Sequence, residues 1–365
     1  MLIYIGSYTD DTHAEGVHLA AFDSSSGSLR HLASFDAGVN PSFLALHPNG
    51  RVLYVVNETA AHEGRATGAV GAFAIDPATG GLTRLGVQAS GGAAPCHVTA
   101  DHEGRAALVA NYVGGSIALL PIAADGSLAP ARQVVRHAGS GADPVRQATP
   151  HPHCIAVDPT NRFALVTDLG TDRVLVYRLD VAPGSLHHLE SAGAVLRPGT
   201  GPRHLAFHPM LPLVFVANEL DSTITTLSFD REHGRLTPLH TRSTRPASWA
   251  GTNYPADLHV APSGRALYVS NRGHDSVVVF SIDGGTGRLA LEQVVPCGGA
   301  WPRSFTLDPT GRWLLVANQR SDSVVVFARD EASGRLTRTS HELAVSQPAC
   351  VRFGGAGNHL GTGMP

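Results

Sequence analysis

The stretch PSFLALHPNGRVLYVVNE at residues 41–58 decides the fold, because variants of it recur along the whole chain. The copies begin at Pro41, Pro95, Pro152, Pro202, Pro255, Pro302 and Pro348. Successive copies start 46 to 57 residues apart, a spacing typical of β-propeller blades. The sequence therefore predicts a propeller with seven blades.

Each copy carries the signals of β-strands. Apolar residues alternate after the starting proline, as Leu44 and Leu46 do, and a period of two predicts a strand. A second strand is expected at residues 52–56, and runs such as 276–282 and 287–291 predict the third and fourth strands. Turn residues separate these runs, and no window shows helical periodicity. We therefore expect an all-β fold with four antiparallel strands in each blade.

The two ends of the chain complement each other. Residues 1–35 contain the second half of a repeat, whereas residues 348–353 contain only the first half. A ring would join the two halves into one blade and leave no open sheet edge. We therefore expect a single propeller domain over residues 1–365, closed by 1–35 with 348–353, and a disordered tail at 354–365.

Composition excludes several classes of function. The 27 basic residues against 30 acidic ones give a net charge of −3, so no basic excess exists to attract a nucleic acid. No run approaches the ~20 apolar residues of a membrane-spanning helix, and the first residues lack the basic start of a signal peptide. We expect a soluble cytoplasmic protein, a monomer or weak homo-oligomer, with neither a nucleic acid nor a membrane as partner.

The spacing of the polar residues does not indicate a binding site for a metal or a cofactor. The 20 histidines include His151 and His153, but no third ligand follows at a recognisable spacing. Calcium loops, nucleotide-binding loops and the GxSxG motif of serine hydrolases are absent from the sequence. The four cysteines lack CxxC spacing and are expected to be reduced. We expect a site with no metal and no cofactor.

A position that every blade needs for its fold should look alike in all copies. The position sixteen residues after the starting proline behaves in this way, with Asn57, Asn111, Asp168, Asn218, Asn271 and Asn318. A short polar side chain there can hydrogen-bond the backbone at the end of a strand. We interpret these residues, and Asp275 further on, as structural.

Positions that differ between blades are candidates for function. The residue after each of these strand ends varies, and so do the residues just after the prolines; the polar members are Glu58, Glu219, Arg272, Gln319, His97, His153, Arg203, His204, Asp257 and Arg303. Antiparallel pairing brings the two sets together at one mouth of the central channel. His259 also stands where most copies have a small residue. Arginines at such a mouth are suited to binding a carboxylate or phosphate group of a substrate. The alternative interpretation is that these charged residues form salt bridges between blades.

Several stretches carry a resemblance to a known family. They are YIGSYT at 4–9, RQATPHPH at 146–153, GPRH at 201–204, ANE at 217–219 and SNRGHD at 270–275. With these, almost the whole chain resembles the seven-bladed β-propeller lactonases, a family that contains bacterial 6-phosphogluconolactonases and the fungal carboxy-cis,cis-muconate cyclase. The resemblance implies a metal-independent site with His153, Arg203, Glu219 and Arg272 as catalytic residues. His151 competes with His153 for the histidine role, and Asp257 stands where many relatives carry glutamate.

The leading hypothesis is hydrolysis of a small anionic sugar lactone, 6-phosphogluconolactone. His153 or Glu219 would activate a water molecule, and arginines would hold the anion and stabilise the oxyanion. Expected substrate-binding residues are His97, His151, His204, Asp257, His259, Arg303, Gln319 and Glu58. An insertion at residues 139–149 is expected to cover the site. Two alternatives remain open: lactonisation of a carboxy-muconate, and a non-catalytic propeller that binds a partner.

Overall fold

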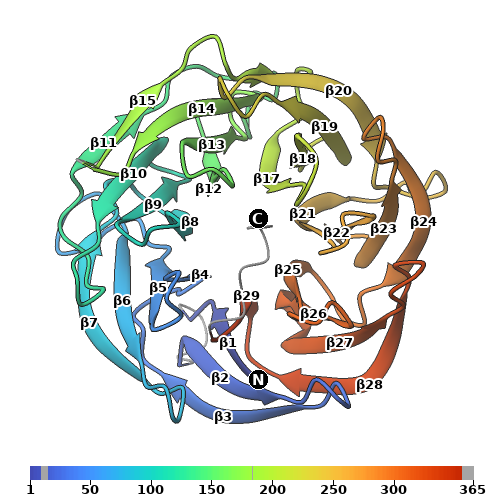
Figure 1. The fold of residues 1–365 in the computed structure, drawn as a ribbon, viewed down its shortest axis with the longest axis horizontal. Helices are drawn as coiled ribbons and strands as arrows, with labels where there is room; N and C mark the ends of the chain where they lie inside the picture. Colours follow the sequence, from blue (N-terminus) through green and yellow to red (C-terminus); the bar gives the residue numbers. More distant parts are fainter. Residues whose placement is uncertain (10–14, 183, 356–365) are drawn as a thin grey trace.

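The computed structural model describes residues 1–9, 15–182 and 184–355, and over these residues the chain forms seven β-sheets arranged in a ring (Figure 1). Six sheets have four strands, and one has a fifth short strand, β16 (Ala194–Val195), which pairs with β14. The one described helical element is a single 3-10 turn, η1 (Gln319–Ser321). The seven-bladed, all-β propeller predicted from the repeats is therefore confirmed.

Each blade contributes one strand to each of four concentric layers. The innermost strands are β29 (Pro348–Phe353), β4 (Phe43–Leu46), β8 (Pro95–Ala100), β12 (Pro152–Val157), β17 (Pro202–Phe207), β21 (Tyr254–Val260) and β25 (Pro302–Leu307). The second strands are β1 (Leu2–Ser7), β5 (Val52–Asn57), β9 (Ala106–Asn111), β13 (Phe163–Asp168), β18 (Leu213–Asn218), β22 (Ala266–Arg272) and β26 (Trp313–Asn318).

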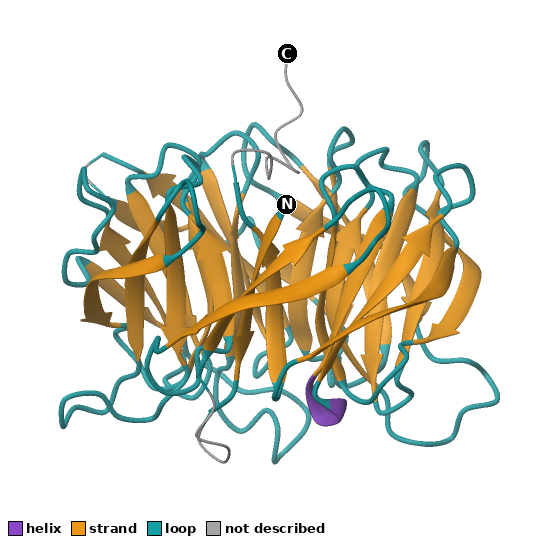
Figure 2. Ribbon diagram, turned by 90° about the horizontal axis from the view of Figure 1, so that it is seen from below, coloured by secondary structure: helices purple, strands orange, loops and turns teal. Residues whose placement is uncertain are grey.

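The two outer layers complete the blades. The third strands are β2 (Val17–Phe22), β6 (Ala69–Ile75), β10 (Ser116–Pro121), β14 (Arg173–Asp180), β19 (Thr223–Phe229), β23 (Ser276–Ile282) and β27 (Ser323–Arg329). The outermost strands are β3 (Leu29–Phe35), β7 (Leu82–Ala89), β11 (Gln133–Arg136), β15 (Ser185–His188), β20 (Leu236–Ser243), β24 (Leu289–Pro296) and β28 (Leu336–Ala344). Figure 2 shows the loops gathered on two opposite faces, with η1 on one of them.

The ring closes in the blade that both ends of the chain share. Strand β29 pairs antiparallel with β1, with Ile3 opposite Phe353 and Ile5 opposite Val351. The backbone N–H of Gly354 also donates to the carbonyl of Leu2 at 2.8 Å. The expected joining of residues 348–353 to the first strands is thus present. Of the tail expected at 354–365, residues 356–365 lie outside the described residues.

Burial explains the sequence pattern of the layers. All six residues of β18 are buried, because both faces of a second strand pack against neighbouring blades. The outer strand β28 alternates instead between residues that are exposed and residues that are partly buried. Because of this alternation, outer strands lack the apolar run that marks a buried strand. The strand expected at 287–291 is observed as β24 at Leu289–Pro296, so it begins two residues later and ends five residues later than expected.

Buried tyrosines connect each of three blades to the next one. The hydroxyls of Tyr4, Tyr54 and Tyr268 donate to the carbonyls of Gly80, Gly126 and Gly334 at 2.8, 3.1 and 2.7 Å, respectively. Each acceptor glycine ends the turn between the third and fourth strands of the following blade, with a positive φ of 77°, 86° or 73°. The positive φ favours glycine there.

Replacing Tyr54 with phenylalanine should lower the free energy of unfolding by about 1–3 kcal/mol, because a buried carbonyl loses its donor while the ring still packs. The equivalent change at Tyr268 should have a similar effect. Urea denaturation measures both, and the slope of the transition should not change. An unaltered midpoint in both variants would show that these hydroxyls do not help the blades to dock.

Several of the repeated polar residues have the structural role expected of them, although the Asn218 amide donates to the hydroxyls of Thr223 and Thr225. The side-chain amides of Asn57, Asn111 and Asn271 donate to backbone carbonyls in the loops that precede their own blades' innermost strands. Asp275 accepts from the backbone N–H groups of Gly273 and Trp301 at 3.0 and 2.8 Å. All four cysteines are unpaired and buried, as expected. Among the described residues, no helix has the length and apolar character needed to cross a membrane.

Candidate active site

A buried carboxylate with three arginines around it lies at one mouth of the central channel. Glu219 directly follows β18, and its Oε2 lies 2.6 Å from Arg272 Nη2 and 3.2 Å from Arg203 Nε. Its Oε1 lies 2.5 Å from Arg146 Nη2. Arg203 and Arg272 are almost fully buried, whereas Arg146 is partly exposed. Three of the four residues predicted to be catalytic are thus in direct contact.

The arginines in this cluster hold the Glu219 carboxylate in its ionised form. Burial alone would raise the pKa of the Glu219 carboxyl, but Arg272, Arg203 and Arg146 outweigh it and lower that pKa to about 2. Burial, with Arg272 and Arg303 nearby, lowers the pKa of Arg203. The carboxylate therefore binds protons weakly, and its main effect is to keep three guanidinium groups together.

In three blades, a β-bulge falls on the candidate residue that directly follows the proline. The register between β17 and β18 shifts between Pro202 and His204, so that Arg203 is the extra residue. The same shift occurs around His153 in β12 and around Arg303 in β25. A bulge re-aims a side chain without ending the strand. His153, Arg203 and Arg303 therefore stand at bulge positions, where the backbone can turn a side chain toward the mouth.

Arg303 forms a second polar cluster with Tyr8 and Glu58 at the same mouth. Its Nη2 donates to the Tyr8 hydroxyl at 2.5 Å and lies 3.8 Å from Glu58 Oε2. The Tyr8 hydroxyl in turn donates to Glu58 at 2.7 Å. Burial raises the pKa of Tyr8, so its hydroxyl stays protonated. Gln319, which begins η1, has a buried Oε1 without a hydrogen bond among the described residues.

His153 lies beside the arginine cluster and is buried. Its ring centroid is 5.3 Å from that of His204 and 5.4 Å from that of Tyr112. Burial, followed by the positive charge of Arg203, lowers the pKa of His153 well below 6.5, so the imidazole is neutral near pH 7. A neutral imidazole can accept a proton, which a general base requires.

His151 has a different environment from His153. Its ring stacks on Tyr112 with centroids 4.4 Å apart, and its Nδ1 donates to the Tyr112 carbonyl at 2.9 Å. Its backbone N–H donates to Asp168. The backbone thus holds the ring of His151, and the ring of Tyr112 contacts the rings of both histidines.

A layer of side chains crosses the channel below the arginine cluster. His204 Nδ1 is 3.0 Å from Asp257 Oδ1, and Asp257 Oδ2 accepts from the Ser304 hydroxyl at 2.9 Å. His97 packs on Phe43 with ring centroids 4.3 Å apart and lies 5.6 Å from the ring of His204. Burial and then Arg203 lower the pKa of His204 to about 4. This layer, defined as Phe43, His97, His204, Asp257 and Ser304, consists of neutral rings and one satisfied carboxylate.

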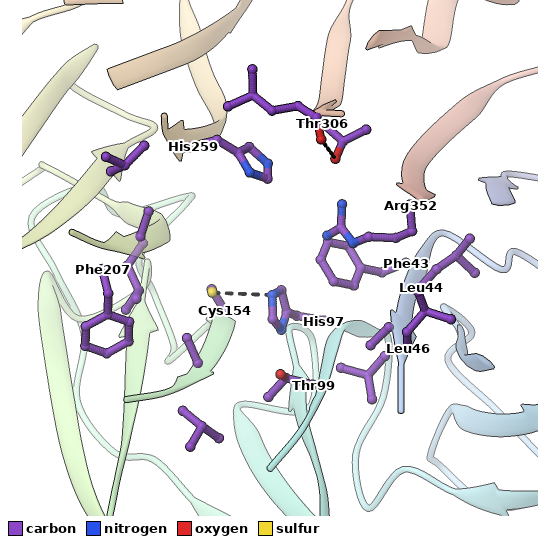
Figure 3. A pocket seen from close by; sticks show the side chains of 18 of the residues that line it. Phe43, Leu44, Leu46, His97, Thr99, Cys154, Phe207, His259, Thr306 and Arg352 are labelled. Atoms are coloured by element: carbon purple, nitrogen blue, oxygen red, sulfur yellow. Dashed lines mark hydrogen bonds between the residues drawn. The ribbon is translucent and has the colours of Figure 1, made fainter. Parts of the chain in front are cut away.

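A cavity of about 450 Å³ lies on the other side of this layer (Figure 3). Its lining includes His97 and His259 but none of His153, Arg203, Glu219 and Arg272. The residues predicted from sequence therefore divide between two depths of the channel. His153, Arg203, Glu219 and Arg272 lie at the mouth with the arginine cluster, which is called the arginine mouth below. His97 and His259 line the cavity, and His204 and Asp257 lie between the mouth and the cavity.

Some residues at these places were given no role on the basis of the sequence. Arg146 belongs to the insertion at 139–149 and reaches Glu219, which supports the expectation that the insertion covers the site. Tyr8 and Tyr112 contact Arg303 and His153. Arg352 lines the cavity and could have been found, because it occupies the same repeat position as His259, where most copies have alanine or threonine.

Comparisons with known proteins agree with this architecture. Residues 2–353 match the family model described as "Lactonase, 7-bladed beta-propeller". The chain is 34% identical to the 6-phosphogluconolactonase of Bacillus subtilis over 96% of this chain and 97% of that protein. It is 33% identical to the 6-phosphogluconolactonase of Formosa agariphila over 83% and 85% of the two chains. The structure of the Pseudomonas aeruginosa periplasmic gluconolactonase is similar with a TM-score of 0.90, 34% identity and coverage of 98% and 100%. This chain belongs to the seven-bladed β-propeller lactonase family.

Proposed function

We propose that this protein hydrolyses 6-phosphogluconolactone at the arginine mouth of the channel. The observation that carries the proposal is the cluster of Arg146, Arg203 and Arg272 around one buried carboxylate, Glu219, with the neutral His153 beside it. The names of the relatives from Bacillus subtilis and Formosa agariphila support the same substrate.

The charge at this mouth suits a phosphorylated lactone. Four arginines, including Arg303, face two carboxylates, Glu219 and Glu58, which leaves an excess of two positive charges. A phosphate monoester carries a charge of roughly −1.5 to −2 at pH 7. Arginine binds such a group with two parallel N–H donors, so binding the substrate would neutralise the excess.

The proposed reaction uses His153 as the base. A water oxygen attacks the lactone carbonyl carbon while His153 takes a proton from the water. An arginine stabilises the oxyanion that forms, since preorganised donors act strongly where water is excluded. The ring C–O bond then breaks, and the proton on His153 passes to the leaving oxygen, which gives the open acid.

Of the two bases expected from the sequence, Glu219 fits the proton transfer less well than His153. Three guanidinium groups hold its carboxylate, and its pKa of about 2 makes it a weak base at neutral pH. We assign to it the positioning of the arginines. Asp257, expected to bind substrate, has its carboxylate occupied by His204, Ser304 and Phe305 N–H, so its contribution would be to orient His204.

The substrate test compares three compounds with purified protein. We expect the hydrolysis of freshly made 6-phosphogluconolactone to exceed that of unphosphorylated gluconolactone about 10- to 100-fold in kcat/KM, because the charged hydrogen bonds to phosphate would be lost. A carboxy-muconate should remain unchanged. The spontaneous rate, measured without protein, is subtracted. Equal rates for both lactones would contradict the phosphate assignment, and turnover of the muconate alone would favour the cyclase alternative.

The location of the protein stays a prediction. The sequence favours the cytoplasm, whereas a similar protein from Pseudomonas aeruginosa is described as periplasmic. Fractionation of the source cells, followed by immunoblotting, would decide between the two compartments.

A further inference from the structure

The cavity on the far side of the layer has the composition of a binding site. It lies among the last residues of the innermost strands, and Figure 3 shows His97, His259, Thr306 and Arg352 around one hollow. These four residues come from different blades, β8, β21, β25 and β29. A volume of about 450 Å³ is enough for a small organic molecule.

Arg352 brings a positive charge to this cavity without a matching carboxylate. Its guanidinium lies over the ring of Phe43, 4.7 Å from the centroid, and its Nη1 donates to the carbonyl of Val351 at 2.9 Å. Within residues 1–9, 15–182 and 184–355, Arg352 has no salt bridge to an aspartate or glutamate. This contrasts with the arginine mouth, where Glu219 pairs with three arginines. A guanidinium with free N–H donors is suited to a carboxylate ligand.

His97 lies in the wall of the same cavity as a neutral ring. It is 9% exposed, and its Nδ1 is buried and makes no hydrogen bond among the described residues. The Sγ of Cys154 lies 3.5 Å from His97 Nε2, and burial raises the pKa of this thiol to about 12, so the thiol proton is present to be donated to Nε2. In a neutral imidazole that accepts at Nε2, the proton resides on Nδ1. Because this N–H is closed to solvent, His97 contributes the face and edge of a neutral ring to the wall of the cavity.

Much of the remaining wall is apolar, although Thr99, His102, His259 and Thr306 also line it. Phe43, Leu46, Leu205 and Phe207 line the cavity between the polar groups. Such a wall would be a poor surface for a sugar phosphate, whose hydroxyls need hydrogen-bond partners. It suits an aromatic or aliphatic body attached to the carboxylate.

We propose that this cavity is a second binding site, which takes a small carboxylate with an apolar body, held by Arg352 beside the ring of His97. The layer of Phe43, His97, His204, Asp257 and Ser304 separates it from the proposed lactone site. The proposal does not depend on the proposed reaction, because none of the residues assigned to catalysis lines the cavity.

Calorimetric titration with benzoate tests the site. We expect saturable binding to the native protein, and binding at least about tenfold weaker for the neutral isostere benzamide and for the Arg352→Gln variant, because a charged hydrogen-bond pair is lost. Arg242→Gln, the same substitution at an exposed position of the outer strand β20, should bind benzoate as the native protein does. Inorganic phosphate should bind more weakly than benzoate at this site, because it lacks an apolar body.

Two further measurements keep the test decisive. Benzoate should raise the melting temperature of the native protein and of Arg242→Gln but not that of Arg352→Gln, and Phe207→Ala should weaken its binding. Hydrolysis of the lactone by Arg352→Gln should stay within about twofold of the native rate, since the layer intervenes. Benzoate binding that survives in Arg352→Gln, or that disappears in Arg272→Gln, would overturn the proposal, and so would a loss of lactone hydrolysis in folded Arg352→Gln.

Discussion

The Glu219→Gln variant should lose about 3–5 kcal/mol of stability and at least about 100-fold in kcat/KM. The carboxylate is the partner of Arg146, Arg203 and Arg272, and the last two are buried with it. Removing one partner of a buried ion pair leaves charges that neither water nor protein compensates. The arginines should then repel one another and leave the positions at which they would hold an anion. Urea denaturation and lactone hydrolysis measure the two losses.

A surface pair provides the matched control for this variant. Glu342 lies 3.2 Å from Arg338 with both side chains exposed, so Glu342→Gln should change stability by less than ~1 kcal/mol and leave the rate unaltered. The pH dependence gives a second check. Because the pKa of Glu219 falls to about 2 from 4.5, its contribution is complete above pH 4.5 and is lost as the pH falls toward 2. An unchanged unfolding midpoint for Glu219→Gln would contradict the assigned role.

Replacing His153 with glutamine should lower kcat by about 10²- to 10⁴-fold, the usual contribution of a general base. In the native protein, burial and then Arg203 keep the pKa of His153 well below 6.5. The imidazole therefore stays neutral as the pH falls from 8 to 6.5, and kcat/KM should be flat over that range and decline only in more acidic solution. Steady-state rates across this range, corrected for spontaneous hydrolysis, measure the profile.

His151→Gln is the control that separates the two candidate histidines. The ring of His151 stacks on Tyr112 and donates to its carbonyl, so its loss should reduce the rate by less than about tenfold. Thermal unfolding of both variants would show that each is folded. If His151→Gln lost as much activity as His153→Gln, or if His153→Gln remained active, the proposed base would be wrong.

The fold could be predicted because the blades repeat one pattern. Each copy places a proline, an alternating strand, a turn and a buried strand in the same order, and the ends supply complementary halves of one blade. The comparison of copies also located the arginine mouth, because in the blades of β12, β17 and β25 the bulge after the proline acts on a residue that varies in sequence, such as Arg203 or Arg303. The repeated pattern thus predicted the propeller fold, and the residues that differ from the pattern predicted candidate site positions.

Depth along the channel could not be predicted in the same way. His97 and His259 stand two positions apart in the repeat pattern, and two residues of a strand advance by about 6–7 Å. That distance is enough to move a side chain from the layer to the cavity. The alternation of side chains along a strand indicates only which face of the strand a residue lies on, and not its depth in the channel. Arg146 escaped for another reason: its insertion has no counterpart in the other blades, so no comparison of copies could show where it reaches.

The pairing of β29 with β1 has a consequence for biosynthesis. Strands β1, β2 and β3 are among the first to be made, but the partner that covers the inner edge of β1 is made only after the other six blades. Throughout translation that edge presents unpaired N–H and C=O groups, which are open to pairing with foreign strands. The nascent chain therefore depends on the six later blades folding quickly, and a ribosome that stalls before residue 348 would release a chain with this edge uncovered.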